Sequence, residues 1–298
     1  MKKILVTGAN GFVGSKLTKL LKEKNYEVIS SDITGEVAYQ GNLLDSNFVK
    51  NLPDVDIVIN CAAVQYLSAN IPWINRHRYF FQNNVEALKN LRSKYDGSIN
   101  FFIQYGSSMM YKENIEGFYN EECDFANNGI YSESKIATFN EYQKLGCDSA
   151  FIIPSIIGGY GRKGFFESLS QMIKLYNIVI MPGSCRNITS IVHVDDVCAL
   201  TCTLLEKKST GIFNVASDDA LSINAWVDLI TKKLETKVFK IRIPLFIFKI
   251  LGCLSGYRLL AKEQLVMLGH CHNLCLKKTK KLGWVPLKGI KDIMEDTF

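Results

Sequence analysis

Short apolar runs alternate with amphipathic segments along the first half of the chain. These runs suit strands buried on both faces of a parallel sheet, and we expect strands at residues 4–6, 27–31, 55–59, 99–105 and 151–154. Apolar residues at helical spacing follow the first run, at Phe12, Val13, Leu17, Leu20 and Leu21. A second helix is expected from Pro72 to Tyr95, with its apolar face formed by Phe80, Phe81, Val85, Leu88 and Leu91. The alternation predicts an α/β fold in which helices cover both faces of a doubly wound parallel sheet.

A glycine-rich turn joins the first strand to the first helix. Gly8, Gly11 and Gly14 have the spacing G-x-x-G-x-x-G, which permits a tight turn and lets a diphosphate approach the backbone. The N–H groups and the positive dipole end of the following helix would face those phosphates. Asp32 ends the second strand, where a carboxylate can accept hydrogen bonds from both ribose hydroxyls and repel a 2′-phosphate. These residues predict a dinucleotide site that prefers NAD over NADP.

The composition indicates in which cellular compartment the protein is expected and which kinds of partner it is expected to bind. The 298 residues are 47% hydrophobic and 21% charged, enough to bury one large core or two joined ones. Nine cysteines at irregular spacing are expected as thiols, and the glycine motif begins too close to Met1 for a cleavable signal sequence, so we expect a cytoplasmic protein. The net charge of +6 is spread along the chain, which disfavours nucleic acid and suits an anionic small molecule. No metal site is expected, because no second Cys/His pair at zinc-finger spacing accompanies His270, Cys271, His272 and Cys275.

Tyr131 and Lys135 are the first candidates for catalysis. Positions four apart share one face of a helix, so the Lys135 ammonium can stabilise a Tyr131 phenolate. A free tyrosine titrates near about 10 and is a poor base at neutral pH. With this support, Tyr131 could exchange a proton with a substrate hydroxyl while a hydride moves to or from a nicotinamide. The alternative is that Tyr131 is a packed tyrosine and Lys135 a surface lysine. A Tyr-x-x-x-Lys spacing that occurs alone usually has this structural explanation.

Motifs along nearly the whole chain resemble those of the extended short-chain dehydrogenase/reductase superfamily, in its NAD-dependent epimerase/dehydratase branch. Thr7 to Gly14 matches the T-G-x-x-G-x-x-G motif of that branch, and Tyr131 to Lys135 matches its Tyr-x-x-x-Lys. Leu282 to Pro286 is similar to its terminal Leu-Gly-Trp-x-Pro signature. The resemblance implies a Rossmann-type fold and an enzyme that uses a nicotinamide cofactor.

The resemblance also assigns roles to single residues. Counting back from Tyr111 by the superfamily's Ser/Thr-x-x-x-Tyr spacing selects Ser107 as the third catalytic residue, beside Tyr131 and Lys135. Tyr131 and Lys135 are also expected to contact the cofactor, together with Gly8, Asn10, Gly11, Phe12, Val13, Gly14, Asp32, Ile33, Asn42, Leu43, Cys61, Ala62, Ala63, Asn84 and Pro154. Relatives usually carry an Asp that meets the adenine amino group where this chain has Asn42, whose amide could still form that bond. Cys61 is expected as a small buried hydrophobe without a redox role.

The second half of the chain is expected to hold the substrate. The stretches from Gly161 to Phe166 and from Pro182 to Asp196 are similar to elements of reductases and epimerases that act on UDP-hexoses in bacterial surface-polysaccharide pathways. In those relatives the two stretches embrace the nucleotide diphosphate, which implies substrate contacts by Ser107, Ser108, Arg162, Lys163 and Arg186. The alternative for the three cations is a set of solvated surface charges. Ile153 and Tyr160 replace the usual Arg and Pro, and Ile156 replaces the Asn of many 4-epimerases, which leaves the substrate class open.

We therefore expect a Rossmann-type doubly wound sheet with a smaller C-terminal mixed α/β substrate lobe. The dinucleotide-binding domain is expected at residues 1–155, joined by strands from about 188–217, and the substrate lobe mainly at 156–298. A homodimer through the helices at 80–91 and 131–145 is expected by analogy with relatives.

One strongly apolar stretch, residues 241–254, raises the question of a membrane segment. Its length is too short for a roughly 30 Å hydrocarbon core, and Arg242 and Lys249 interrupt it. No transmembrane segment is expected, and we predict a buried or interfacial helix there.

The resemblance implies hydride transfer at C4 of a nucleotide-activated hexose, with NAD favoured over NADP. Epimerisation at C4, 4-ketoreduction and alcohol oxidation share this machinery and stay open. Asp32 favours tightly kept NAD and hence epimerisation, whereas Ile156 favours the reductases. A sugar 4,6-dehydratase is disfavoured because Ser108 and Met109 replace its Asp-Glu pair. The alternative from another class is a non-catalytic NAD(P)-binding sensor or assembly subunit, against which the intact catalytic residues argue.

Overall fold

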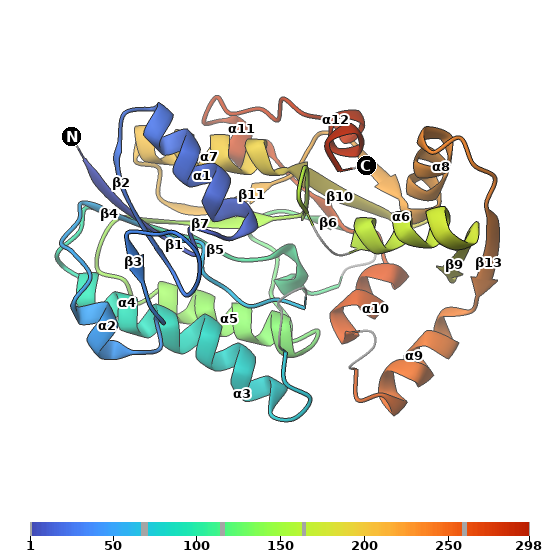
Figure 1. Ribbon diagram of the computed structural model, residues 1–298, viewed down its shortest axis with the longest axis horizontal. Helices are drawn as coiled ribbons and strands as arrows, with labels where there is room; N and C mark the ends of the chain where they lie inside the picture. The colour runs from blue at the N-terminus through green and yellow to red at the C-terminus, as the bar shows by residue number, and fades with distance from the viewer. Residues whose placement is uncertain (1, 67–70, 114–116, 163–164, 258–260, 298) are drawn as a thin grey trace.

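The molecule is organised around a seven-stranded parallel sheet (Figure 1). The computed structural model describes residues 2–66, 71–113, 117–162, 165–257 and 261–297. The strands of the sheet lie in the order β11 (Gly211–Val215), β7 (Ser149–Pro154), β5 (Phe101–Tyr105), β4 (Ile57–Asn60), β1 (Lys3–Thr7), β2 (Glu27–Asp32) and β3 (Tyr39–Gln40). From β1 the chain moves outward through β2 and β3 and then returns to β4, on the other side of β1. Ligands bind at such reversals of strand order in open α/β sheets.

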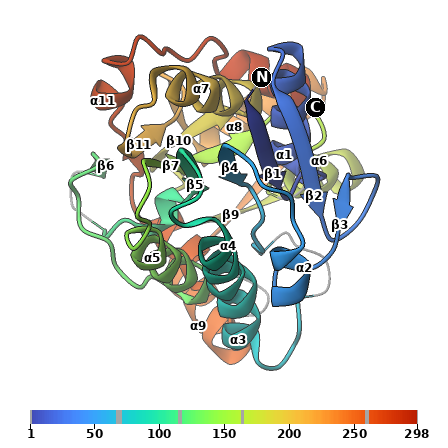
Figure 2. The same cartoon turned by 90° about the vertical axis from the view of Figure 1, so that its left-hand side faces the viewer.

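Helices cover both faces of this sheet (Figures 1 and 2). One face carries α1 (Phe12–Glu23) and α7 (Val194–Lys207), and the other carries α2 (Ser46–Lys50), α3 (Arg76–Phe81), α4 (Ala87–Tyr95) and α5 (Ile130–Tyr142). In β1, Ile4 and Val6 pack into the core beneath α1 and α7, whereas Leu5 packs into the core on the opposite face. A strand covered on both faces needs apolar residues at successive positions, which explains the runs in the sequence. The predicted doubly wound fold is confirmed.

The helix expected from Pro72 to Tyr95 begins later than predicted. Helix α3 starts at Arg76, because Asn75 has a left-handed conformation with φ 60° that cannot continue a right-handed helix. After α3, a π-helical turn, η1 (Gln82–Glu86), leads directly into α4. The apolar face was predicted correctly for its main members, since the structure buries Phe80, Val85, Leu88 and Leu91.

A second, smaller lobe is built from short sheets and helices (Figure 1). One sheet contains β8 (Ile156–Gly158), β10 (Ile188–His193) and β12 (Ala220–Ser222), and two further pairs are β9 (Ile178–Pro182) with β13 (Phe239–Ile243) and β6 (Phe118–Tyr119) with β14 (Asn273–Leu274). The remaining α-helices are α6 (Phe165–Tyr176), α8 (Ile223–Lys233), α9 (Leu245–Leu254), α10 (Lys262–Gly269), α11 (Lys277–Lys280) and α12 (Ile290–Thr297). The lobe has its own core, which includes Met181, Ile191 and Trp226. The chain enters this lobe and then returns to the central sheet through α7 and β11, so the lobe is not one continuous stretch of sequence. The expected domain division at residue 155 stays a prediction.

The apolar stretch at 241–254 divides into a strand and a helix. Its first residues, through Ile243, belong to β13, and Pro244 then precedes α9. Proline cannot donate to a strand partner and its fixed φ suits the start of a helix, so the change of structure occurs there. Of the two alternatives predicted for this stretch, the buried helix is wrong for α9, since Gly252 is the only residue of this fully described helix that is buried. The interfacial alternative stays a prediction. Among the described residues, no helix combines the length and apolarity needed to cross a membrane.

Candidate active site

The glycine-rich turn packs directly against the end of the neighbouring strand. Gly8 has a φ of +66°, and a Cβ there would lie 2.6 Å from the backbone nitrogen of Ala62, just after β4. A Cβ on Gly14 would lie 2.0 Å from the Gly8 carbonyl oxygen. A side chain at either position would therefore force the turn apart. What remains is an exposed backbone surface at the first turn of α1, where N–H groups without helical partners suit a diphosphate.

Asp32 lies beside this surface, at the end of β2. Its Oδ2 accepts a hydrogen bond from the backbone N–H of Asn10 at 2.9 Å, and its Oδ1 accepts one from the N–H of Ile33 at 2.7 Å. These bonds fix the carboxylate next to the glycine turn, and each oxygen keeps a second lone pair for a ribose hydroxyl. The Asn10 side chain donates to the carbonyl of Thr34, which ties the turn to the segment after β2. The turn and Asp32 together fit the diphosphate and ribose of NAD.

The other predicted cofactor contacts lie along the same edge of the sheet. Asn42 Oδ1 accepts a hydrogen bond from the Leu44 N–H at 2.9 Å, which leaves the NH₂ group of Asn42 for a ligand. Burial raises the pKa of the Cys61 thiol to about 12, which agrees with its expected packing role. Of the remaining predicted contacts, Ile33 and Ala63 are exposed, Phe12, Val13 and Ala62 are partly buried, and Leu43 and Pro154 are buried. Contacts between these residues and a cofactor stay predictions.

Asn84, on η1, joins two segments of the site by hydrogen bonds. Its Oδ1 accepts a hydrogen bond from the Val64 N–H at 2.8 Å, and its NH₂ donates to the Val64 carbonyl at 3.2 Å and to Ser134 Oγ at 3.0 Å. The side chain thereby fastens the loop after β4 to α5. Single π-helical turns occur often at functional sites, and here the turn carries the bracing residue. A direct contact between Asn84 and the cofactor stays a prediction.

Ser107, Tyr131 and Lys135 come together near the carboxyl end of β5. Ser107 caps the short 3₁₀ helix η2 (Ser108–Met110), and the other two residues lie one turn apart on α5. Ser107 is close enough to the Tyr131 phenol for its side chain to lower the pKa of that phenol, and Lys135 Nζ lies 6.0 Å from the centre of the Tyr131 ring. This arrangement brings together a candidate acid/base, a hydroxyl that can position its substrate and a cation that can support the phenolate.

Burial dominates the ionisation of this pair. It raises the pKa of Tyr131 to about 12, although the Ser107 hydrogen bond and the charge of Arg162 act in the opposite direction. Burial lowers the pKa of Lys135 to about 8. Removing one proton from the pair gives either a neutral lysine or a phenolate beside an ammonium, and the two forms exchange by moving a proton. The second form is the one that can act as a base, and positive charge near the ring favours it.

A buried chain of polar groups holds Lys135 in place. Thr7 Oγ1 donates to Asn60 Oδ1 at 2.6 Å, and the Asn60 amide donates to Gln104 Oε1 at 2.8 Å. Gln104 Nε2 and Lys135 Nζ both donate to the Tyr105 carbonyl oxygen, each at 3.1 Å. The ends of β1, β4 and β5 therefore fix the position of the ammonium. Sequence reasoning missed Gln104, because a single polar residue in an apolar strand gives no catalytic signal.

Of the cations predicted to bind phosphate, Arg162 is the described one whose charge acts on Tyr131. Its guanidinium carbon lies 5.1 Å from the centre of the Phe12 ring in the glycine turn, and its Nη2 donates to Gln65 Oε1 at 3.2 Å. The charge of the same guanidinium acts to lower the pKa of Tyr131. Arg186 is exposed on the loop between β9 and β10, and no described contact joins its side chain to the catalytic residues. Lys163 lies outside the described residues.

The carboxylate of Glu263, on α10, caps α5, the helix that carries Tyr131 and Lys135. Its Oε1 accepts hydrogen bonds from the N–H groups of Tyr131 at 2.8 Å and Ser132 at 3.0 Å, and its Oε2 accepts one from the Tyr66 hydroxyl at 2.8 Å. Gly129, the N-cap of α5, has no side chain to do this, and a Cβ there would lie 2.3 Å from Glu263 Cδ. Glu263 is 1% exposed, and its charge lies at the positive end of the helix dipole. It also raises the pKa of Tyr131, against the effect of Arg162.

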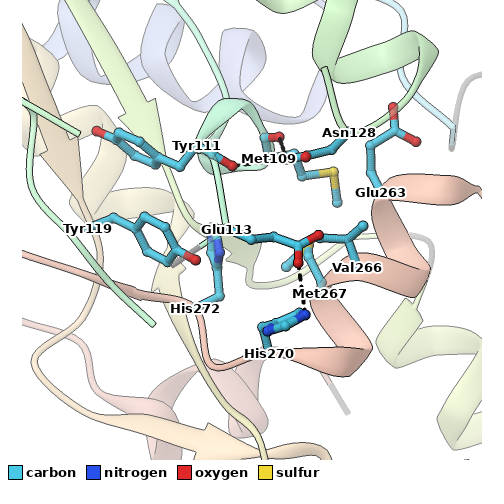
Figure 3. A pocket seen from close by; sticks show the side chains of 10 residues that line it. All are labelled: Met109, Tyr111, Glu113, Tyr119, Asn128, Glu263, Val266, Met267, His270 and His272. Atoms are coloured by element: carbon cyan, nitrogen blue, oxygen red, sulfur yellow. Dashed lines mark hydrogen bonds and ion pairs between the residues drawn. The ribbon is translucent and has the colours of Figure 1, made fainter. Parts of the chain in front are cut away.

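A small pocket lies beside the catalytic residues, between η2 and α10 (Figure 3). Its lining consists of Met109, Tyr111, Glu113, Tyr119, Asn128, Glu263, Val266, Met267, His270 and His272. Glu113 Oε2 and His270 Nε2 lie 2.8 Å apart. Burial lowers the pKa of His272 to about 4, so its ring is neutral. The thioether of Met109 cannot transfer a proton. Among the described residues, no group of three or more His, Cys, Asp or Glu side chains could hold a metal ion.

Comparison with known protein families agrees with this geometry. Residues 4–216 match the NAD dependent epimerase/dehydratase family. The chain belongs to this family. The epimerase/dehydratase match includes the glycine turn, Asp32 and all three predicted catalytic residues, whereas Glu263 lies beyond it. The protein is therefore an NAD-dependent enzyme of the epimerase/dehydratase type.

Several relatives of this epimerase/dehydratase chain match it over nearly their whole length. The UDP-glucose 4-epimerase of Vibrio cholerae is 24% identical over 317 residues, which cover 99% of this chain and 94% of the relative. The low-salt glycan biosynthesis protein Agl12 of Haloferax volcanii is 24% identical over 325 residues, covering 98% and 96%. A UDP-glucuronic acid 4-epimerase from Bacillus cereus, solved with UDP-glucuronic acid and NAD, is 20% identical with a TM-score of 0.80, covering 99% of this chain and 97% of that one. This likeness shows that the fold is shared.

Proposed function

We propose that the protein transfers a hydride at C4 of a nucleotide-activated hexose, in the first place a UDP-hexose, and acts as a 4-epimerase that retains its NAD. The observation that carries the proposal is the meeting of Ser107, Tyr131 and Lys135 at the same edge of the sheet as the glycine turn and Asp32. Relatives named as UDP-sugar 4-epimerases support the substrate class. Arg162 supports it further, because it offers a guanidinium for phosphate oxygens beside the catalytic residues.

The catalytic residues would divide the proton transfer among them. Bound NAD supplies the hydride acceptor and donor. Tyr131 takes the proton of the C4 hydroxyl and later returns it, while Ser107 hydrogen-bonds the same oxygen and Lys135 stabilises the phenolate. For inversion, the oxidised sugar must turn within the site so that the hydride returns to its other face.

Lys135→Met should shift the pH profile of substrate oxidation to higher pH. In the unaltered protein the first proton leaves the Tyr131–Lys135 pair near the lysine pKa of about 8, so the oxidation rate should rise with pH up to there and then level off. Without the lysine, Tyr131 must ionise alone with its pKa of about 12. The rate at pH 7 should fall by about 100-fold or more. Single-turnover reduction of the bound cofactor, followed by absorbance against pH, measures both effects, and an unshifted profile would contradict the assignment.

A 4-ketoreductase is the second candidate. Ile156, partly buried at the start of β8, occupies the place where many 4-epimerases carry an Asn, which favours reductases. A dehydratase is disfavoured by the thioether of Met109 in the pocket. The assembled catalytic residues likewise disfavour a non-catalytic NAD(P)-binding sensor. Polysaccharide biosynthesis as the pathway is part of our proposal, supported by the name of the Haloferax relative. A cytoplasmic location and a homodimer stay predictions.

The nucleotide retained by the protein distinguishes the two candidates. Denaturing the freshly purified protein should release NAD at about one equivalent per chain, identified by mass spectrometry and absorbance. Asp32→Ala should retain at least about tenfold less NAD, because the ribose loses its acceptor and the Asn10 N–H loses its partner. An empty site in the unaltered protein, together with NADH oxidation by a 4-keto nucleotide-sugar, would overturn the epimerase in favour of the reductase.

A further inference from the structure

Helix α9 exposes an apolar surface that neither the fold nor the catalytic site explains. Eight of its ten residues are Leu, Ile, Phe or Cys, and Gly252 is its only buried residue. Phe246 is 61% exposed and Leu254 is 80% exposed, with Ile247, Ile250 and Leu251 exposed between them. Isolated apolar residues on a protein surface need no explanation, but a continuous patch on one short helix marks an interaction site.

A second exposed apolar segment lies near α9. Trp73 and Ile74, in the loop before α3, are 70% and 74% exposed. Arg76 at the start of α3 donates from Nη1 to the carbonyl of Tyr257 at 2.9 Å, which joins this loop to the turn after α9. Figures 1 and 2 both show α3 and α9 at the same outer edge of the molecule. The two segments therefore contribute to one surface.

The charged residues within the two segments that form this surface are all basic. Neither residues 71–85 nor residues 241–262 contain an aspartate or a glutamate. The same segments carry basic residues, which include Arg76, Arg78, Arg242, Lys249 and Lys262. All of these except Arg76 are exposed. An apolar face edged by cations matches the boundary of a bilayer with anionic headgroups, where apolar side chains enter the acyl layer and cations meet phosphates.

We propose that α9, together with Trp73 and Ile74, docks the protein on the surface of an anionic lipid bilayer. The ten residues of α9 span about 15 Å, half of a hydrocarbon core, so the helix lies in the plane of the interface and does not cross it. Gly252 permits the close packing of α9 on α10, since a Cβ there would lie 3.1 Å from Leu265. The docking surface is thus fixed to the lobe that carries Glu263.

Co-sedimentation with vesicles tests the proposal. The full chain should bind vesicles of 70% phosphatidylcholine and 30% phosphatidylglycerol, and bind pure phosphatidylcholine vesicles far less. The triple variant Phe246→Ser, Ile250→Ser, Leu254→Ser should lose at least about tenfold in partition. The matched control is Val285→Ser with Leu287→Ser, which removes exposed apolar residues from a segment held to α7 and should bind as the unaltered protein does.

A single charge reversal keeps the test independent of the apolar substitutions. Lys249→Glu leaves the apolar residues in place and should weaken binding to the anionic vesicles by about fivefold or more. Salt at 0.5 M should weaken it as well, because it screens exposed charges. Failure of the unaltered chain to bind the anionic vesicles would overturn the proposal. So would a dimer of the unaltered protein in analytical ultracentrifugation that the triple variant converts to monomer, because a second copy would then cover α9.

Discussion

Replacing Tyr131 with phenylalanine is expected to lower turnover by about a thousandfold or more. The substitution removes the phenolic hydroxyl that lies near Ser107 and Lys135, and it leaves the ring that packs near Phe80, with ring centres 6.0 Å apart. The fold and the glycine turn should therefore survive. Turnover of a UDP-hexose and the NAD content of the same preparation are the two measurements, and the NAD content should change by no more than a few-fold.

The matched control is Tyr142→Phe. Tyr142 lies on the same helix and is buried, but its ring packs against Phe139 and Phe151, away from the catalytic residues. Its replacement should leave turnover nearly unchanged. Tyr131→Phe with normal turnover would remove the catalytic assignment, and equal losses in the two variants would indicate a general effect on the helix.

Glu263→Ala is expected to have the largest effect on stability. It leaves the N–H groups of Tyr131 and Ser132 and the hydroxyl of Tyr66 without their acceptor. An unsatisfied buried donor costs about 1–3 kcal/mol, so the free energy of unfolding should fall by about 3 kcal/mol or more. Urea unfolding measures this change. The matched control is Glu113→Gln, since Glu113 lines the same pocket but is partly exposed and paired with His270, and its loss should cost about 1 kcal/mol or less.

Glu263→Gln separates the charge of Glu263 from its hydrogen bonds. The amide oxygen can still accept from the two N–H groups, so the free energy of unfolding should fall by less than in Glu263→Ala. The negative charge that raises the pKa of Tyr131 is gone, so the pH at which substrate oxidation levels off should move downward. An unchanged pH profile in a folded Glu263→Gln protein would show that Glu263 is structural alone.

The parts of the site that depend on local spacing could be predicted from the sequence. The glycine turn requires residues without a Cβ at fixed distances from a strand, and Gly8 and Gly14 show why in the structure. Tyr131 and Lys135 share a face because they lie four apart on a helix. The parallel sheet with helices on both faces follows from the alternation of apolar runs and helices, because parallel strands need crossover connections.

The parts that depend on contacts between distant segments could not be predicted. Glu263 meets Tyr131 across 132 positions of sequence, and the residues around it give no sign of a helix cap. The late start of α3 depends on the backbone conformation of Asn75, which the proline before it does not reveal. The choice between a buried and an interfacial helix for α9 could not be made for the same reason, since apolar composition alone does not separate a core helix from one that faces outward.

The most direct test of the proposed chemistry follows a label at C4. UDP-glucose carrying deuterium at C4 should be incubated with the purified protein without added cofactor, and the product analysed by NMR. The account predicts inversion at C4 with the deuterium retained on that carbon, because the hydride leaves and returns within one site. Inversion at another carbon, loss of the deuterium to water, or no change in any UDP-hexose while NAD is bound would contradict it.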